Sequence, residues 1–176
     1  MPLTPYHMGP GMLVKAILRG AFSLMVFGWT QVLIDVQPLA ALALGGREHG
    51  FSHTYVGATV IAVFAAVTGK YLADLVLRLA PRVAPRPARV GWRVAFLSAF
   101  VGAYSHILLD SMVHSDLRPF APFSQARPML GWWPASAMNE FCVYTGIAGV
   151  VLYFGVGSLL SRRQRRLKNG KPREAR

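Results

Sequence analysis

The sequence is poor in cysteine and in acidic residues. Its single cysteine, Cys142, lies in an apolar run, which excludes an intramolecular disulfide and a cysteine-based zinc finger. Only 7 aspartates and glutamates stand against 19 lysines and arginines, and the formal net charge is +12. Because carboxylates are scarce, each one that falls inside an apolar stretch is a candidate for a functional role.

Several motifs of well-defined enzyme classes are also missing. The chain contains no phosphate-cradling glycine loop, no dinucleotide-binding fingerprint and no nucleophile elbow. We expect no cleavable signal peptide, because the first apolar segment contains Lys15 and Arg19 and no clean small-residue cleavage site follows it. Nucleotide-dependent and serine-hydrolase chemistry therefore find no support.

Long apolar runs, in contrast, are plentiful. Apolar side chains make up 53% of the 176 residues, and the mean hydropathy is +0.38. Three runs have the roughly 20 residues that a helix needs to cross a hydrocarbon core about 30 Å thick. We predict spanning helices at about 54–79, 94–113 and 139–160.

The basic residues are concentrated in two places. Five arginines lie between Arg78 and Arg93, and eight basic residues lie between Arg162 and Arg176. Beside apolar spans, such clusters are more typical of a cytoplasmic flank that faces anionic lipid headgroups than of a nucleic-acid-binding tail. Two predicted spans separate the clusters, so both lie on one side, which the positive-inside rule makes cytoplasmic. We expect membrane lipids as partners and no nucleic acid, and the oligomeric state stays open.

The segment from Gly11 to Ile34 allows two readings. One straight helix would carry His7 some 35 Å from Asp35 at about 1.5 Å per residue. Two short helices with a turn at 19–23, where Gly20 supplies the break, would return both residues to one end. The hairpin is favoured. The predicted fold is an all-α, polytopic integral membrane helical bundle with three long spans and a short N-terminal helical hairpin; residues 1–160 form one domain and 161–176 a disordered, basic cytoplasmic tail.

All five histidines fall in three short stretches, which also hold three of the seven acids. His106, Asp110 and His114 recur at i, i+4 and i+8, so a helix places them along one stripe. Imidazoles and carboxylates at this spacing are typical ligands of a divalent metal ion. The alternatives are a packing role for His106, a capping loop at 49–54, in which Ser52 or Thr54 begins the next helix, and a helix-cap role for Asp35.

Four stretches resemble, in the same order, the signatures of a family of membrane-bound metal-dependent hydrolases that includes the YdjM-like inner-membrane proteins. That family's pattern approximates Thr-His near the start, Pro-Asp-x-Asp, His-Arg-Gly-x-Thr-His and Ser-His-x-x-x-Asp, and the resemblance covers roughly residues 4–124. The matching stretches are Thr4-Pro5-Tyr6-His7-Met8-Gly9-Pro10, Leu33-Ile34-Asp35-Val36-Gln37-Pro38, His49-Gly50-Phe51-Ser52-His53-Thr54-Tyr55-Val56-Gly57-Ala58 and Ser105-His106-Ile107-Leu108-Leu109-Asp110-Ser111.

The chain departs from this pattern in two places. Ile34 and Gln37 replace the proline and the second aspartate, and the first histidine of the third stretch is shifted by one place. These departures weaken a two-metal centre but leave enough ligands for one ion. The resemblance implies a bacterial inner (plasma) membrane protein, with the C-terminus cytoplasmic by the charge argument above.

The leading hypothesis is a zinc-type site at the non-cytoplasmic face, mononuclear or alternatively dinuclear. A water acidified by the metal would attack an ester or phosphoester, with lipids among the candidate substrates. Glu48, His114 and Asp116 are the candidate catalytic residues, and Arg47 and Arg118 are candidates for binding phosphate oxygens. The candidate metal ligands are His7, Asp35, His49, His53, His106 and Asp110.

The alternative is a non-enzymatic membrane protein with a structural metal site or an ion or proton pathway. Buried carboxylates and histidines also mark transport pathways. Transport requires polar groups that continue through the membrane to its other face. Beyond the histidine and aspartate stretches, only Thr68, Lys70 and Asp74 are candidates for such groups. The depth of the polar residues therefore discriminates between the two functions.

Overall fold

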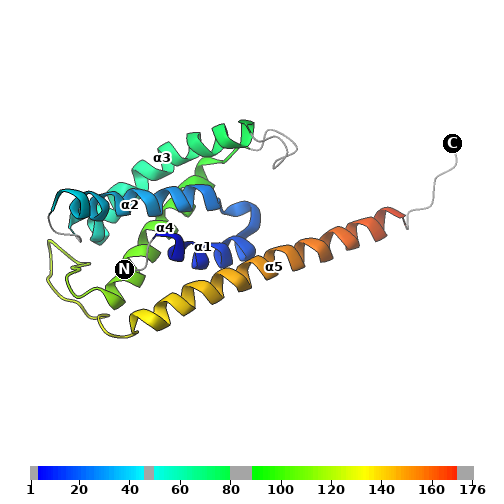
Figure 1. Ribbon diagram of the computed structural model, residues 1–176. Helices are drawn as coiled ribbons and strands as arrows, with labels where there is room; N and C mark the ends of the chain where they lie inside the picture. The colour runs from blue at the N-terminus through cyan, green and yellow to red at the C-terminus, as the bar shows by residue number, and fades with distance from the viewer. Residues whose placement is uncertain (1–3, 46–49, 80–88, 170–176) are drawn as a thin grey trace.

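The computed structural model describes residues 4–45, 50–79 and 89–169, without the side chains of 4, 5, 160 and 162–169. Its described residues form helices and no strand, which confirms the all-α prediction (Figure 1). Of the predicted site residues, Arg47, Glu48 and His49 lie outside the described residues, as does most of the arginine-rich loop around Arg82. The elements are α1 (Thr4–Leu18), the 3₁₀ turn η1 (Arg19–Ala21), α2 (Leu24–Leu44), the 3₁₀ turn η2 (Phe51–His53), α3 (Tyr55–Leu79), α4 (Trp92–Val113) and α5 (Ala135–Asn169).

Four of these helices are long and apolar enough to cross a membrane, one more than the sequence predicted. The additional one is α2, which continues through Pro38 to Leu44 and has 21 residues, or about 31 Å. A cap role for Asp35 is therefore wrong, because Asp35 lies inside α2. In addition, α5 continues past the predicted end of its span at residue 160 to Asn169.

The N-terminal hairpin is confirmed, with its turn where the sequence predicted it. Lys15 Nζ donates hydrogen bonds to the carbonyls of Arg19 and Phe22 at 2.6 and 2.7 Å, which holds the end of α1 against the start of α2. The break differs in detail. Arg19, and not Gly20, adopts the left-handed backbone conformation, with φ 47°, and its guanidinium lies 5.1 Å from the ring centre of Tyr153.

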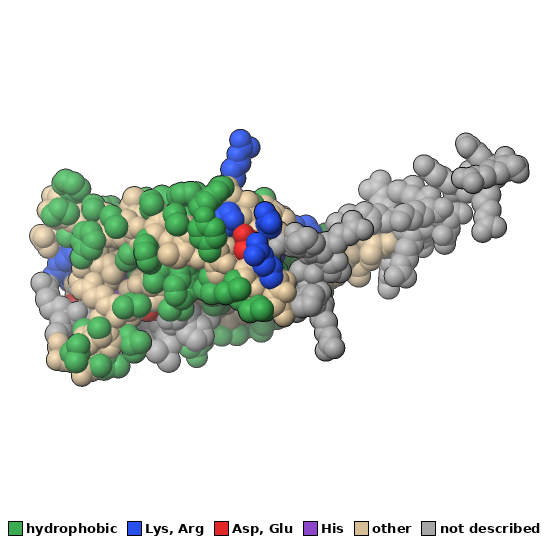
Figure 2. Space-filling view, turned by 90° about the horizontal axis from the view of Figure 1, so that it is seen from above, with side chains coloured by type: hydrophobic (Ala, Val, Ile, Leu, Met, Phe, Trp, Pro, Cys, Tyr) green, Lys and Arg blue, Asp and Glu red, His purple; other side chains and the backbone are tan. Residues whose placement is uncertain are grey.

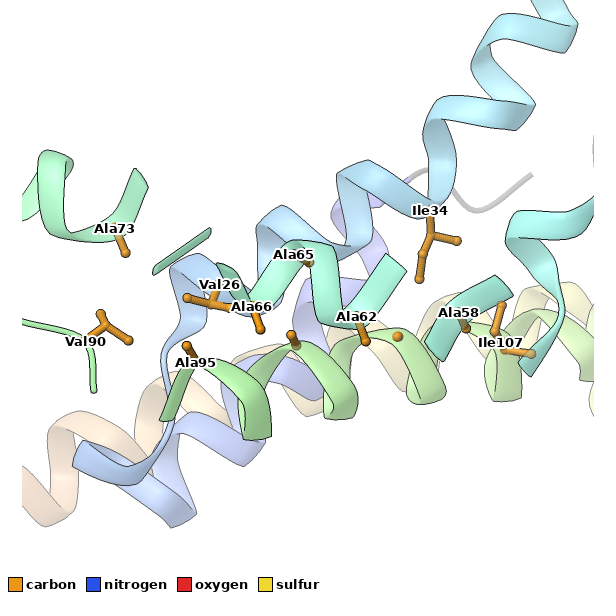
Figure 3. Close-up of a cluster of buried hydrophobic side chains, with 12 residues drawn as sticks. Val26, Ile34, Ala58, Ala62, Ala65, Ala66, Ala73, Val90, Ala95 and Ile107 are labelled. Atoms are coloured by element: carbon orange, nitrogen blue, oxygen red, sulfur yellow. The ribbon is translucent and has the colours of Figure 1, made fainter. Parts of the chain in front are cut away.

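Alanines line the contact between α3 and α4. Ala62, Ala65 and Ala66 of α3 and Ala99 and Ala103 of α4 are fully buried in one cluster, with Val26 and Ile34 of α2 packed against it (Figure 3). Small side chains let helix backbones approach closely inside a membrane, where van der Waals contact and not water exclusion holds helices together. Large apolar side chains instead cover the outer face, and basic ones gather toward one end (Figure 2).

Glycines allow α1 to lie directly on α5 (Figure 1). A Cβ on Gly9 would overlap the carbonyl oxygen of Cys142, and a Cβ on Gly149 would lie 2.6 Å from the backbone nitrogen of Leu13. At 15 residues, or about 22 Å, α1 is too short to span a bilayer, so this contact with α5 shields it.

We expect Gly9→Ala to lower the free energy of unfolding by about 1–3 kcal/mol, the usual cost of overpacking a tight contact. The matched control is Gly155→Ala on α5, where a Cβ meets nothing within 4 Å. There alanine's higher helix propensity is expected to leave stability unchanged or raise it by up to about 1 kcal/mol. Unfolding in detergent micelles, followed by helical circular dichroism, measures both, and equal effects of the two substitutions would contradict the α1–α5 contact.

Candidate metal centre

Four elements bring histidines and aspartates together at one end of the bundle. His7 comes from α1, Asp35 from α2, His53 from η2, and His106 and Asp110 from α4. Two sets of three can each supply ligand atoms within 4.8 Å of one another: His7 with His106 and Asp110, and Asp35 with His53 and His106. His106 belongs to both sets and therefore lies at the centre of the site.

Asp110 lies at hydrogen-bonding or slightly longer distance from all the surrounding imidazoles. Its Oδ1 is 3.3 Å from His7 Nε2, and its Oδ2 is 3.1 Å from His106 Nε2 and 3.6 Å from His53 Nε2. Asp110 is only 4% exposed, so water contributes little to the solvation of its charge. The positive charge that stabilises this carboxylate must therefore come from the site itself, either as protons on the imidazoles or as a cation.

Asp35 approaches the same imidazoles from the more open side. Its Oδ1 lies 3.2 Å from His106 Nε2 and 3.8 Å from His53 Nε2, and its side chain is 25% exposed. The His7, His53 and His106 rings are at most 2% exposed. Water therefore reaches the cluster from the side of Asp35.

Gln31 fixes the tautomer of His106. The Gln31 amide nitrogen donates to the carbonyl of Gly102 at 3.2 Å, so its amide oxygen is the atom that faces His106 Nδ1, 2.5 Å away. An amide oxygen only accepts, and Nδ1 therefore carries the hydrogen. In the neutral ring, the lone pair is then on Nε2, which points at the carboxylates of Asp35 and Asp110.

The spacing of these atoms fits a shared metal ion. His106 Nε2, and both ring nitrogens of His7, are buried and make no hydrogen bond of acceptable geometry with the described residues. Two atoms that each bind a tetrahedral zinc at about 2.1 Å lie about 3.4 Å apart. Six imidazole–carboxylate distances among the described residues of the cluster fall between 3.1 and 3.9 Å, close to that value. The donor set of imidazole and carboxylate likewise suits a divalent transition metal.

Gln37 and Ser52 hold the turn that carries His53. The backbone N–H of Ser52 donates to Gln37 Oε1 at 2.9 Å, and the Ser52 hydroxyl lies 2.9 Å from His53 Nδ1. Thr54 ends this turn and caps α3, because its hydroxyl accepts from the Gly57 N–H at 2.9 Å. The capping role predicted for Thr54 is thus confirmed, and it coexists with a buried His53 in the cluster.

The other predicted residues lie at the edge of the cluster or beyond it. His114 is the C-terminal cap of α4, and its Nε2 is 3.9 Å from Asp110 Oδ1. Asp116 is exposed and belongs to neither possible ligand set. Arg118 donates to the carbonyls of Ser115 and Leu117 at 3.1 and 3.2 Å, and it lines a cavity of about 330 Å³ beside η2.

Sequence reasoning missed Gln31 and assigned no contact to Gln37. Gln31 precedes Asp35 by four residues, which places both on one face of α2, and an isolated amide in an apolar run was the available signal. Gln37 replaces an aspartate of the family pattern, yet it does not leave its position empty, because it bonds to the turn that carries His53. Gln31 bonds to a candidate ligand and Gln37 to the turn that carries one, and such contacts appear only in the folded structure.

We expect Gln31→Leu to lower the affinity for a divalent metal about 10–100-fold, the usual cost of removing an outer hydrogen-bond partner of a ligating histidine. Gln31→Glu keeps an acceptor for Nδ1 and is expected to retain most of the affinity. Thr30→Val is the control, since Thr30 is equally buried on α2 but bonds to the carbonyl of Val26. Competition with a chelating dye measures the affinity; equal affinities of the Gln31→Leu and Thr30→Val proteins would show that Gln31 does not orient His106.

A family model described as YdjM inner membrane protein matches residues 13–167. This range includes Asp35, His53, His106 and Asp110, and it begins after His7. No curated protein and no solved structure matches the chain. Since the family model covers most of the chain, and four apolar helices fit a membrane protein, the chain belongs to the YdjM inner membrane protein family.

Proposed function

We propose that this protein is a membrane-bound, metal-dependent hydrolase that binds one zinc-type ion and cleaves an ester or a phosphoester. The observation that carries the proposal is the convergence of three buried imidazoles on Asp110 and Asp35 at the distances that separate ligands of a common ion. An ion here would lower the pKa of a bound water toward about 7 and polarise the substrate oxygen.

A single ion accounts best for the shared His106. In the tautomer that Gln31 imposes, Nε2 has one lone pair, so His106 cannot serve both possible ligand sets with separate ions. We therefore place His7, His53, His106 and Asp110 on the buried side of one ion and Asp35 on its open side; the ion would bind a subset of these five at one time, which leaves a position for the attacking water. Water approaches past Asp35, the most exposed of these residues.

The residues at the edge of the cluster supply the proton transfer and the substrate contact. We assign His114, 3.9 Å from Asp110 and partly exposed, as the group that takes a proton from the attacking water. The water oxygen bonds to the carbonyl carbon or phosphorus, the bond to the leaving oxygen breaks, and His114 returns the proton to that oxygen. Arg118, at the wall of the cavity beside η2, would bind phosphate oxygens.

The distribution of buried polar groups favours this function over an ion or proton pathway. Among the described buried residues, the only aspartate, glutamate, lysine, arginine or histidine outside the cluster is Asp74, which pairs with Lys70 at 2.9 Å and accepts from the Val90 N–H at 2.7 Å. The hydroxyl of Thr68 bonds to the carbonyl of Phe64. These groups are engaged locally, and an alanine-rich core occupies the interior of the bundle (Figure 3).

We further propose that the metal site faces the non-cytoplasmic side and that the C-terminus is cytoplasmic. Arg78 at the end of α3, together with Arg89 and Arg93 around the start of α4, lies at the end of the bundle opposite His106.

A reporter enzyme that folds only outside the cytoplasm is expected to stay inactive when fused after Arg176 and to become active when inserted at 124–126, between α4 and α5. The reverse pattern would invert the orientation.

The proposed ion is tested by metal content in the purified protein. We expect about one equivalent of divalent metal per chain, and at least a 10- to 100-fold weaker affinity in Asp110→Asn, because losing a ligand costs no less than losing its outer partner. Glu140→Gln is the matched control, since it removes one carboxylate from the exposed start of α5. Retention of metal by Asp110→Asn at the level of Glu140→Gln would refute the site.

Hydrolysis is tested separately on the same preparations. We expect the metal-loaded protein to cleave an activated ester or phosphodiester, and a chelator to abolish the activity. Re-addition of zinc should restore it. A protein that holds the metal but cleaves neither class of substrate would leave a structural metal site and contradict the hydrolase assignment.

A further inference from the structure

An apolar groove runs along the membrane-spanning part of α5, beside the candidate metal centre. It has a volume of about 500 Å³ and is lined by Tyr6 and Gly9 of α1 and by one face of α5 between Cys142 and Val151. This volume lies within the range of small-molecule sites in proteins. No charged side chain lines the groove.

The groove is long, because its α5 lining repeats at helical spacing. Cys142, Gly146 and Val150 form one row at i, i+4 and i+8, with a parallel row one residue later. From Cys142 to Val151 the helix rises about 14 Å. Gly146 has no side chain to fill the groove at this point. A Cβ there would lie 3.2 Å from the Cα of Gly9, on the opposite wall.

One end of the groove adjoins the metal centre. Tyr6 is the neighbour of His7 in α1, and Cys142 packs in a cluster with Leu109, the neighbour of Asp110 in α4. From there the groove follows α5 to Val150 and Val151, just past the middle of the apolar stretch Ala135–Leu159. A lipid whose head lies at the site would thus have its chain in the bilayer interior.

We propose that this groove binds the acyl chain of a lipid substrate and presents its ester or phosphoester to the metal centre. The inference rests on the proposed hydrolase function and names the substrate class. The charges are complementary: a cation held by His7 and Asp110 suits the polar head of a lipid, and the uncharged groove suits its chain. The substrate enters from the membrane along α5 and needs no passage through water.

The decisive variant is Val150→Trp, which fills the far end of the groove without touching a proposed ligand. Val150 is 44% exposed, so a larger side chain has room to fold over the groove without disturbing the core. Leu152→Trp is the matched control, since Leu152 is 40% exposed on the same helix and does not line the groove. Both proteins are expected to keep the wild-type metal content.

The first readout is chain-length selectivity of hydrolysis by the full-length protein. We expect Val150→Trp to lower kcat/KM for p-nitrophenyl dodecanoate about tenfold, equivalent to losing the burial of about two methylenes, and to leave p-nitrophenyl acetate unchanged. Leu152→Trp should change neither. Equal effects of the two tryptophans on the long-chain ester, or equal loss of both esters in Val150→Trp, would overturn the groove assignment.

The second readout does not depend on catalysis. In vesicles of phosphatidylethanolamine and phosphatidylglycerol, a photoreactive group near the lipid carbonyl is expected to label Tyr6 and Val143, and one near the terminal methyl to label Val150 and Val151. Val150→Trp should suppress the labelling of Val151 by the terminal-methyl probe, and Leu152→Trp should not.

Uniform labelling of α5, or cross-links between two copies of the chain in place of lipid, would overturn the proposal even if metal binding and hydrolysis hold. Loss of all hydrolysis with this pattern intact would refute the enzyme and leave a lipid-binding groove.

Discussion

The buried carboxylate of Asp110 is the constraint on which the rest of the site depends. A charge at the apolar end of a membrane helix is costly unless it is paired, and Asp110 meets Nε2 atoms of His7, His53 and His106 within 3.6 Å. Each of these partners comes from a different element. Removing the carboxylate would leave only the partly exposed Asp35 as a counter-charge, and Asp35 faces His53 and His106.

Three sets of hydrogen bonds position these partners. The turn after α1, held by Lys15, brings His7 back to the end of the bundle at which α2 ends. Gln37 fixes the short turn that carries His53, and Gln31 orients His106 through Nδ1. The alanine contact between α3 and α4 then sets the depth of His106 and Asp110 relative to η2. The proposed lipid substrate fits this arrangement because one end of an apolar groove, at Tyr6 and Cys142, lies near the site.

Spacing along one helix made part of this site predictable from sequence. His106 and Asp110 are one turn apart, so any helix through them places both on one face, and the structure does so. The hairpin was also predictable, because a straight helix would have separated His7 from Asp35. The length of α2 was not, since the segment was predicted to end at Ile34, whereas the helix continues through Asp35 and Pro38 to Leu44. Arg19 as the left-handed residue and Gln31 as the partner of His106 depend on tertiary contacts that no local pattern encodes.

The central claim is that three imidazoles and the aspartates bind one ion, and X-ray absorption at the metal edge of the zinc-loaded protein tests it most directly. The account predicts a first shell of nitrogen and oxygen at about 2.0–2.2 Å, with the outer scattering of three imidazole rings and no metal–metal distance. A shell of oxygen alone, without imidazole scattering, or a second zinc within about 4 Å, would contradict it.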